Sequence, residues 1–196
     1  MSVPMTMFHL SGRGYPPAKL NNASLLIIDA QKEYLSGPLA LSGMDEAVKN
    51  IAKMLEAARK AGRPIIHVRH LGTVGGMFDP QGPRGEFIPG LEPQGDEMII
   101  EKRMPNAFKN TQLHETLQAL GHLDLIVCGF MSHSSVSTTV RRAKDYGYRC
   151  TLVEDASATR DLAFKDGVIP AAQIHQCEMA VMADNFACVA PTASLI

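Results

Sequence analysis

Short, almost continuous runs of apolar residues recur along the chain, and each is long enough for one buried strand. The clearest, SLLIID at 24–29, is apolar on both faces and ends in an acid. Runs of this kind are typical of the central strands of a parallel sheet, which is covered on both sides. The expected strands lie at 24–29, 64–69, 97–101, 124–129, 149–154 and 186–189.

Segments with a helical period separate these runs. Between 44 and 61, Ile51, Leu55 and Ala58 recur at spacings of three and four, and Gly62 follows as a C-terminal glycine does. The other expected helices lie at 110–120, 134–146 and 170–184. Alternating strands and helices indicate right-handed βαβ units. We therefore expect an α/β fold, a Rossmann-like three-layer α/β/α sandwich with a roughly six-stranded parallel sheet.

The length of 196 residues fits a single domain, 1–196, in which residues 1–20 form an N-terminal extension. The stretch 71–95 holds seven Gly and four Pro, and it is long for a loop in a compact domain. Its glycines suit either a lid over a site or an arm that reaches another subunit. The sequence does not separate these two roles.

The amino-acid composition argues against several functional classes of protein. Nineteen Lys and Arg against 20 Asp and Glu give a net charge of -1, which argues against a nucleic-acid binder. No apolar run approaches the ~20 residues that a membrane span needs, and no secretion signal is evident. The four cysteines form no CxxC pair and no cluster at metal-ligand spacing. We expect a cytoplasmic protein without structural zinc, membrane or nucleic-acid partners.

Chemically notable residues follow three of the predicted strands. The site of an open α/β sheet lies outside the carboxyl ends of its strands, where Asp29, Lys102 and the turn 129–135 are expected. Burial would raise the pKa of Asp29 and suit it to proton transfer, although an Asp there also caps loops. Lys102 suits the stabilisation of negative charge, although it could simply pair with Glu101.

The turn at 129–135 leads directly into a predicted helix. Free backbone N–H groups at a helix N-terminus bind anions and stabilise an oxyanion, and they activate a nucleophile placed there. The alternative role is capping, the commonest one for Ser at this position, by Ser132, Ser134 or Ser135. The turn alone does not decide between the two.

Together, three motifs resemble the isochorismatase-like cysteine hydrolase superfamily. They are LLIIDAQKEY, EKRMPNAF and GFMSHSSVSTTVRRAKDYGY, and the resemblance extends from about residue 24 to 189. It implies a hydrolase of small molecules that needs no cofactor and forms homo-oligomers. By position, it makes Asp29 the catalytic general base, Lys102 the catalytic lysine and Ser135 the residue at the place of the nucleophilic cysteine.

The resemblance also implies a binding pocket around these residues. It predicts a cis peptide between Phe130 and Met131, with an oxyanion hole formed by the N–H groups of Met131 and Ser135. The aromatic or pocket-lining positions that would bind substrate are Tyr34, His70, Phe108 and Phe130. Nicotinamidases of this superfamily bind a metal through an Asp and His residues that follow the catalytic Asp closely. Residues 31–45 contain no histidine, so we expect no metal and no nicotinamidase.

Ser135 departs from the family pattern. A thiol with a pKa of ~8.5 is partly ionised near neutral pH, whereas a serine hydroxyl normally relies on a histidine base. A Ser135–Asp29–Lys102 amidase would therefore be slow, and the serine could be natural or engineered. One alternative is hydrolysis of a vinyl ether, as in true isochorismatases, with Asp29 as general acid. Another is an inactive protein that binds a small molecule.

Overall fold

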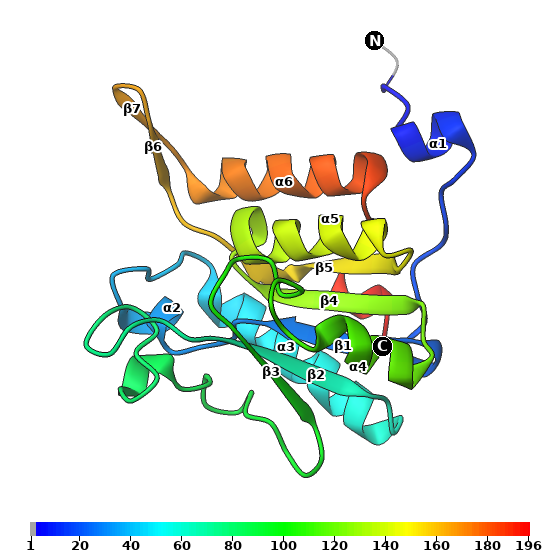
Figure 1. Cartoon of the computed structure of the whole chain (residues 1–196). Coiled ribbons are helices and arrows are strands. Elements are labelled where there is room, and N and C mark those ends of the chain that lie inside the picture. Colours follow the sequence, from blue (N-terminus) through cyan, green and yellow to red (C-terminus); the bar gives the residue numbers. More distant parts are fainter. Residues whose placement is uncertain (1–2) are drawn as a thin grey trace.

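The computed structural model describes residues 3–196. Its centre is a six-stranded parallel sheet. The strand order is β3-β2-β1-β4-β5-β8, and all neighbours in it run parallel. The strands are β1 Ser24–Ile28, β2 Ile65–His70, β3 Met98–Lys102, β4 Asp124–Phe130, β5 Arg149–Ala158 and β8 Cys188–Ala190. This arrangement confirms the predicted α/β/α fold, in which helices flank both faces of the sheet (Figure 1).

Helices cover the two faces of the sheet unequally. α3 (Met44–Lys60) packs on one face, whereas α4 (Leu113–Leu120), α5 (Ser137–Asp145) and α6 (Ala171–Asn185) lie on the other. Successive side chains of a strand point to opposite faces, so β1 serves both layers. Leu25 and Ile27 join the cluster on the α3 side, and Leu26 and Ile28 join the opposite cluster.

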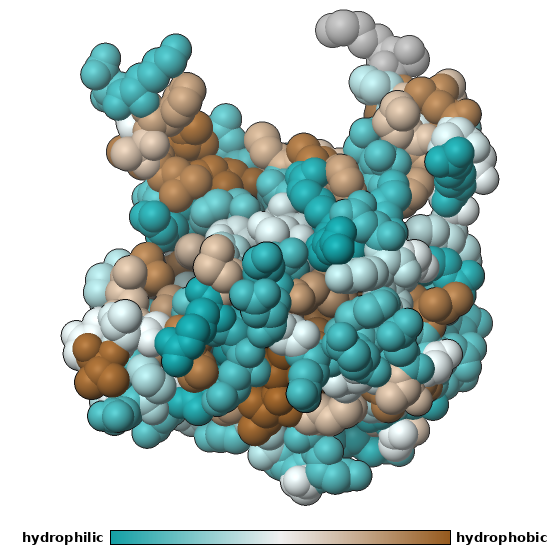
Figure 2. Space-filling view, in the orientation of Figure 1, coloured by the Kyte–Doolittle hydropathy of each residue, from teal (hydrophilic) through white to brown (hydrophobic). Residues whose placement is uncertain are grey.

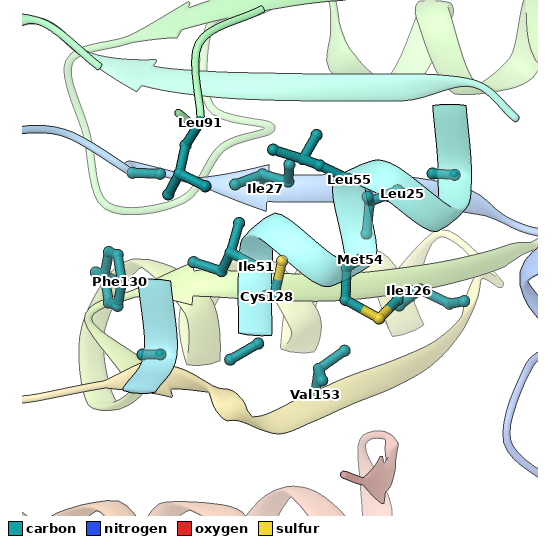
Figure 3. Close-up of a cluster of buried hydrophobic side chains, with 14 of the residues drawn as sticks. Leu25, Ile27, Ile51, Met54, Leu55, Leu91, Ile126, Cys128, Phe130 and Val153 are labelled. Atoms are coloured by element: carbon teal, nitrogen blue, oxygen red, sulfur yellow. The ribbon is translucent and has the colours of Figure 1, made fainter. Parts of the chain in front are cut away.

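The α3 cluster is the larger of the two cores (Figure 3). Ile51, Met54 and Leu55 of α3 are fully buried there against β1 and β4. Burying each side chain of this size stabilises the fold by roughly 1.5–3 kcal/mol. Cys128 lies in the same cluster, and burial raises the pKa of its thiol well above the ordinary value. This thiol is therefore core filler, as its place in an apolar run predicts.

Several boundaries differ from those predicted. α4 begins at Leu113 rather than at residue 110, because Asn110 has a left-handed φ of 55° that no helix accommodates. β5 continues to Ala158, beyond the expected end at 154. The last strand occupies 188–190 rather than 186–189. Within 3–196, no helix combines the length and apolar character that a membrane span requires.

Besides short 3-10 turns, four small elements were not predicted. They are α1 (Met7–Ser11), α2 (Glu33–Ser36) and an antiparallel hairpin of β6 (Leu162–Phe164) and β7 (Gly167–Ile169). The hairpin projects from the body of the molecule beside α6 (Figure 1). It has no buried residue, so no apolar periodicity marks it in the sequence.

Candidate active site

The carboxyl ends of the strands bring Asp29, Lys102 and Ser135 together. Asp29 follows β1, Lys102 is the last residue of β3, and Ser135 lies in the turn after β4. β2 separates β3 from β1, so the long Lys102 side chain crosses the end of β2 to reach Asp29. His70, the last residue of β2, is the register partner of Lys102 and lies along this path.

The Lys102 ammonium group is hydrogen-bonded to three other side chains of the site. Its Nζ donates to Oδ2 of Asp29 at 2.7 Å, to Nδ1 of His70 at 3.1 Å and to Oγ of Ser135 at 3.2 Å. An ammonium group carries three N–H donors, so this set uses all of them. Lys102 is thereby fixed in one orientation, between a carboxylate, an imidazole and a hydroxyl.

Asp29, Lys102 and Ser135 are all buried, and this burial affects the pKa of the Asp29 carboxyl. Asp29 is 0% and Ser135 6% exposed, and the Lys102 side chain is fully buried. Burial raises the pKa of Asp29, and the Lys102 charge and hydrogen bonds from Lys102 and Ser135 oppose that rise. Asp29 Oδ1 is buried and has no hydrogen-bond partner among residues 3–196, and the residue has a left-handed φ of 51°. This carboxyl oxygen is thus not held by a hydrogen bond, in contrast to Oδ2, which accepts from Lys102.

His70 is neutral near pH 7. Burial, followed by the charges of Lys102 and Arg103, lowers its pKa to about 4. A neutral imidazole that accepts at Nδ1 carries its proton on Nε2. The backbone of His70 is fixed by Gln31, whose Oε1 accepts from the His70 N–H at 2.7 Å and whose Nε2 donates to the His70 carbonyl at 2.9 Å.

The turn after β4 places Ser135. The expected cis peptide between Phe130 and Met131 is present, which confirms that prediction. A single π-helical turn, Ser132–Val136, then precedes α5, where the sequence predicted an ordinary helix from residue 134. Gly129 has a φ of 115°, and a Cβ there would lie 2.0 Å from the carbonyl oxygen of Ile28. Only glycine therefore allows β4 to approach the end of β1 this closely.

Aromatic rings extend from the group of Asp29, Lys102 and Ser135 in a connected row. Tyr34 packs edge-on against Phe130 at 5.7 Å and Phe78 at 5.2 Å between ring centroids, and Phe78 packs against His70 at 4.8 Å. Three of the predicted substrate-binding residues, Tyr34, His70 and Phe130, thus lie in this row. Phe78 is a fourth member, and the sequence analysis did not select it as a site residue.

Phe108 is not part of this row. Its ring packs against Tyr146 at 5.2 Å and Tyr148 at 6.2 Å, in the hydrophobic cluster on the α4–α6 side of the sheet. Phe130 and Tyr34 belong to the cluster on the opposite side. Phe108 therefore packs as a core residue of the α4–α6 cluster, and a role for it in substrate binding stays a prediction.

Part of the 71–95 segment is tied to the site. The Glu33 carboxylate, fully buried in α2, accepts from the Phe78 N–H at 2.9 Å and from Arg84 at 3.3 Å. Gln31 also donates to the carbonyl of Gly85 at 2.9 Å. These contacts hold the segment over the aromatic row of its own chain. Gln31 and Glu33 follow Asp29 closely, but no local pattern in the sequence reveals partners some 50 positions away.

The two other histidines near this turn form no hydrogen bond with Ser135. His133 Nδ1 is hydrogen-bonded to Thr159 Oγ1, and His175 Nδ1 lies 3.1 Å from Ser132 Oγ. A cavity of about 280 Å³ adjoins them, lined by Ser42, Gly43, Ser157, Ala158, Thr159, Ala171, Ala172 and His175. Among residues 3–196, no three His, Cys, Asp or Glu side chains are grouped to hold a metal ion.

Comparisons with known proteins place this geometry in a family. Residues 23–194 match the family model for the isochorismatase domain. The isochorismatase family protein YddQ of Bacillus subtilis is 39% identical, over 88% of this chain and 98% of its own. A streptothricin hydrolase of Streptomyces noursei is 32% identical, over 76% of this chain and 60% of its own.

Solved structures agree with the sequence comparisons. The crystal structure of an isochorismatase from Pseudomonas putida KT2440 is 88% identical in sequence and superposes with a TM-score of 0.98. The match covers 99% of this chain and 100% of that one. The family model, the relatives and the fold agree, and the chain belongs to the isochorismatase family of hydrolases.

Proposed function

We propose that the protein hydrolyses the C–N bond of a small-molecule amide, with Asp29, Lys102 and Ser135 as catalytic residues. The observation that carries the proposal is the buried Lys102 ammonium, which is within hydrogen-bond distance of both the Asp29 carboxylate and the Ser135 hydroxyl. This arrangement joins a candidate nucleophile, a proton acceptor and a positive charge. The similarity to a streptothricin hydrolase supports hydrolytic chemistry of this kind.

The proposed reaction proceeds through an ester of Ser135. Its Oγ forms a bond to the substrate carbonyl carbon while the hydroxyl proton passes to Asp29. The N–H groups of Met131 and Ser135 would hold the resulting oxyanion. Asp29 then returns the proton to the leaving nitrogen as the C–N bond breaks. Water, deprotonated by Asp29, then attacks the ester carbonyl. As the bond to Oγ breaks and the acid leaves, Asp29 returns that proton to Ser135 Oγ.

A serine hydroxyl is a weak nucleophile, and the Lys102 ammonium group would make Ser135 more reactive. An ammonium group 3.2 Å from Oγ stabilises a developing alkoxide, and a low-dielectric site strengthens that attraction. No imidazole supplies the base here, since His133 binds Thr159 and His70 binds Lys102. We therefore expect a cysteine at position 135 to accelerate acylation.

One observation favours a second candidate, acid-catalysed hydrolysis of a vinyl ether. Asp29 Oδ1 is buried without a hydrogen-bond partner in the described part of the chain, and burial raises the pKa of the carboxyl, as suits a proton donor. The protonated carboxyl would transfer its proton to the terminal vinyl carbon. Water then adds to the resulting oxocarbenium ion, and the hemiketal collapses to a ketone and an alcohol. Ser135 would form no covalent bond in this reaction.

Parallel assays of four proteins separate the candidates. The unchanged chain, Ser135→Cys, Ser135→Ala and Asp29→Asn are each tested on a panel of small amides and on isochorismate. Amide hydrolysis that rises in Ser135→Cys and disappears in Ser135→Ala supports the first proposal. Vinyl-ether hydrolysis that survives Ser135→Ala but not Asp29→Asn supports the second. A compound that binds in calorimetry but is turned over by no variant overturns both and indicates a binding protein.

A further inference from the structure

The cavity of about 280 Å³ lies at the carboxyl end of β5. β5 ends beside β4, because Ala158 is the register partner of Phe130, so the cavity lies at the same edge of the sheet as the candidate active site. Its other walls come from the segment before α3 and from the start of α6, at the left of Figure 1. Ligands of open α/β sheets bind at this edge, although Asp29, Lys102 and Ser135 do not line the cavity.

The cavity is polar, but none of the described residues that line it is charged. Its lining consists of three hydroxyl side chains, one imidazole, three alanines and a glycine, from Ser42, Ser157, Thr159, His175, Ala158, Ala171, Ala172 and Gly43. Burial lowers the pKa of His175, so its imidazole is neutral near pH 7. A charged ligand would be buried here without a counter-charge in the lining, which is costly. Hydroxyl groups donate and accept hydrogen bonds, and alanine methyls contact alkyl carbons, so the lining suits a small uncharged polar molecule.

The size and the opening of the cavity also suit a small molecule. A volume of about 280 Å³ equals that of about nine water molecules at ~30 Å³ each. The β6–β7 hairpin connects Thr159 to Ala171 without covering the cavity, because it projects from the body of the molecule and no residue of its strands is buried. Figure 2 shows hydrophobic residues of the hairpin at the surface. A molecule of a few carbon atoms can therefore enter from solvent.

Two hydrogen bonds connect the wall of the cavity to the turn that carries Ser135. Nδ1 of His175 lies 3.1 Å from Ser132 Oγ, and Thr159 Oγ1 is hydrogen-bonded to His133 Nδ1. Ser132, His133 and Ser135 belong to a single π-helical turn. A ligand that contacts Thr159 and His175 therefore holds the two side chains that in turn hold this part of the chain.

We propose that this cavity is a second binding site, for a small uncharged molecule with hydroxyl or amide groups, and that its occupation stabilises the turn that positions Ser135. The site is separate from Asp29, Lys102 and Ser135 and does not depend on the proposed reaction. A ligand stabilises only those conformations that bind it, so openings of the turn that also disrupt the cavity become rarer in its presence. Ligand and turn are thereby coupled although the ligand does not contact Ser135.

Three probes with a three-carbon skeleton test the binding site. Propane-1,2-diol is uncharged, lactate carries a carboxylate, and 1-aminopropan-2-ol carries an ammonium group. In nitrogen-15 NMR spectra of the full chain, the diol should shift the amide signals of Ser157, Thr159 and Ala172 saturably. The charged probes should bind at least about tenfold more weakly, because the lining offers them no counter-charge.

A pair of alanine variants in α6 shows whether the diol occupies this cavity. Ala172→Leu places a larger side chain at the lining and should abolish the shifts. Ala180→Leu changes an exposed alanine of the same helix that does not line the cavity. It is the matched control and should bind the diol as the unchanged chain does.

Hydrogen exchange measured by mass spectrometry tests the coupling to the turn. At a diol concentration ten times the measured Kd, exchange through openings that disrupt the site should slow about elevenfold. This slowing is expected for residues 132–136 and not for α1, which lies at the far end of α6 (Figure 1). Ser132→Ala removes the hydrogen bond to His175 and leaves the lining unchanged, so it should bind the diol normally but show less slowing in the turn.

Several outcomes would overturn the proposal. The binding site is refuted by the absence of saturable shifts at Ser157, Thr159 and Ala172, by undiminished binding in Ala172→Leu, or by equal affinity for a charged probe. Binding that leaves exchange in 132–136 unchanged refutes the coupling to Ser135. None of these outcomes bears on amide hydrolysis, which the assays of the Ser135 and Asp29 variants test separately.

Discussion

The ammonium group of Lys102 donates to Nδ1 of His70 at 3.1 Å, joining the last residues of two neighbouring strands. Only a neutral imidazole accepts such a bond, and burial together with the Lys102 charge lowers the pKa of His70 to about 4. His70 is thus a neutral support for the lysine that Asp29 and Ser135 share. This support is lost once His70 is protonated.

Stability should therefore fall as the pH drops from about 6.5 to about 4. In that window the unfolded chain binds a proton at His70 and the folded chain does not, so acid favours unfolding. Because His70 is only partly buried, solvent screening keeps the loss below the ~3 kcal/mol that the full shift would give. Urea unfolding at the two ends of the window should show a smaller loss for His70→Gln, which does not titrate. Equal losses in both proteins would contradict this interpretation of His70.

The buried Asp29–Lys102 pair should show strong coupling. Lys102→Met leaves the Asp29 carboxyl buried without its partner, and breaking a buried pair costs on the order of 3–5 kcal/mol. Asp29→Asn leaves the ammonium equally unpaired. The double variant removes both charges, so its loss in unfolding free energy should be smaller than the sum of the single losses. Additive losses in a double-mutant cycle would show that the two groups do not interact.

The sheet could be predicted because its strands are buried on both faces. Leu25 to Ile28 contact two different cores, which leaves an uninterrupted apolar run in the sequence. The hairpin at 162–169 contributes nothing to either core and leaves no such trace. Asn110 starts no helix because its φ is positive, a property that helical periodicity does not report.

Only part of the candidate site could be predicted from the sequence. Asp29, Lys102 and Ser135 each follow or end a strand, so topology alone directs them to one edge of the sheet. The roles of Gln31, Glu33 and Phe78 depend on contacts with residues 39 to 54 positions away. Such pairings become visible only once the chain is folded. Phe108 shows the converse, since an aromatic close to a motif can still pack into the core.

Gly129→Ala should destabilise the chain and remove activity together. A methyl group at this position would lie 2.0 Å from the Ile28 carbonyl oxygen, at a φ of 115° that L-residues rarely adopt. Relief of the clash must separate β4 from β1 and so separate Ser135 from Asp29. Gly147→Ala is the control, because its φ is also positive but no atom lies within 4 Å. Thermal unfolding should report a much larger loss for Gly129→Ala than for Gly147→Ala.

Glu33→Gln should loosen the segment that covers the aromatic row while leaving the sheet intact. The Glu33 carboxylate is the shared acceptor for the Phe78 N–H and for Arg84, and it is fully buried between them. An amide at this position loses the charge that Arg84 requires and offers one acceptor oxygen in place of two.

Hydrogen exchange measured by mass spectrometry should then rise in peptides covering 76–85, with little change in β1 and β4. The control is Glu86→Gln, which breaks the more exposed ion pair between the same two regions, that of Lys32 with Glu86. Exposed pairs contribute at most about 1 kcal/mol, so exchange in that variant should remain close to that of the unchanged chain. Equal protection in both variants would show that the segment is held by its apolar contacts, Phe78 on Tyr34 and His70, and not by the buried carboxylate.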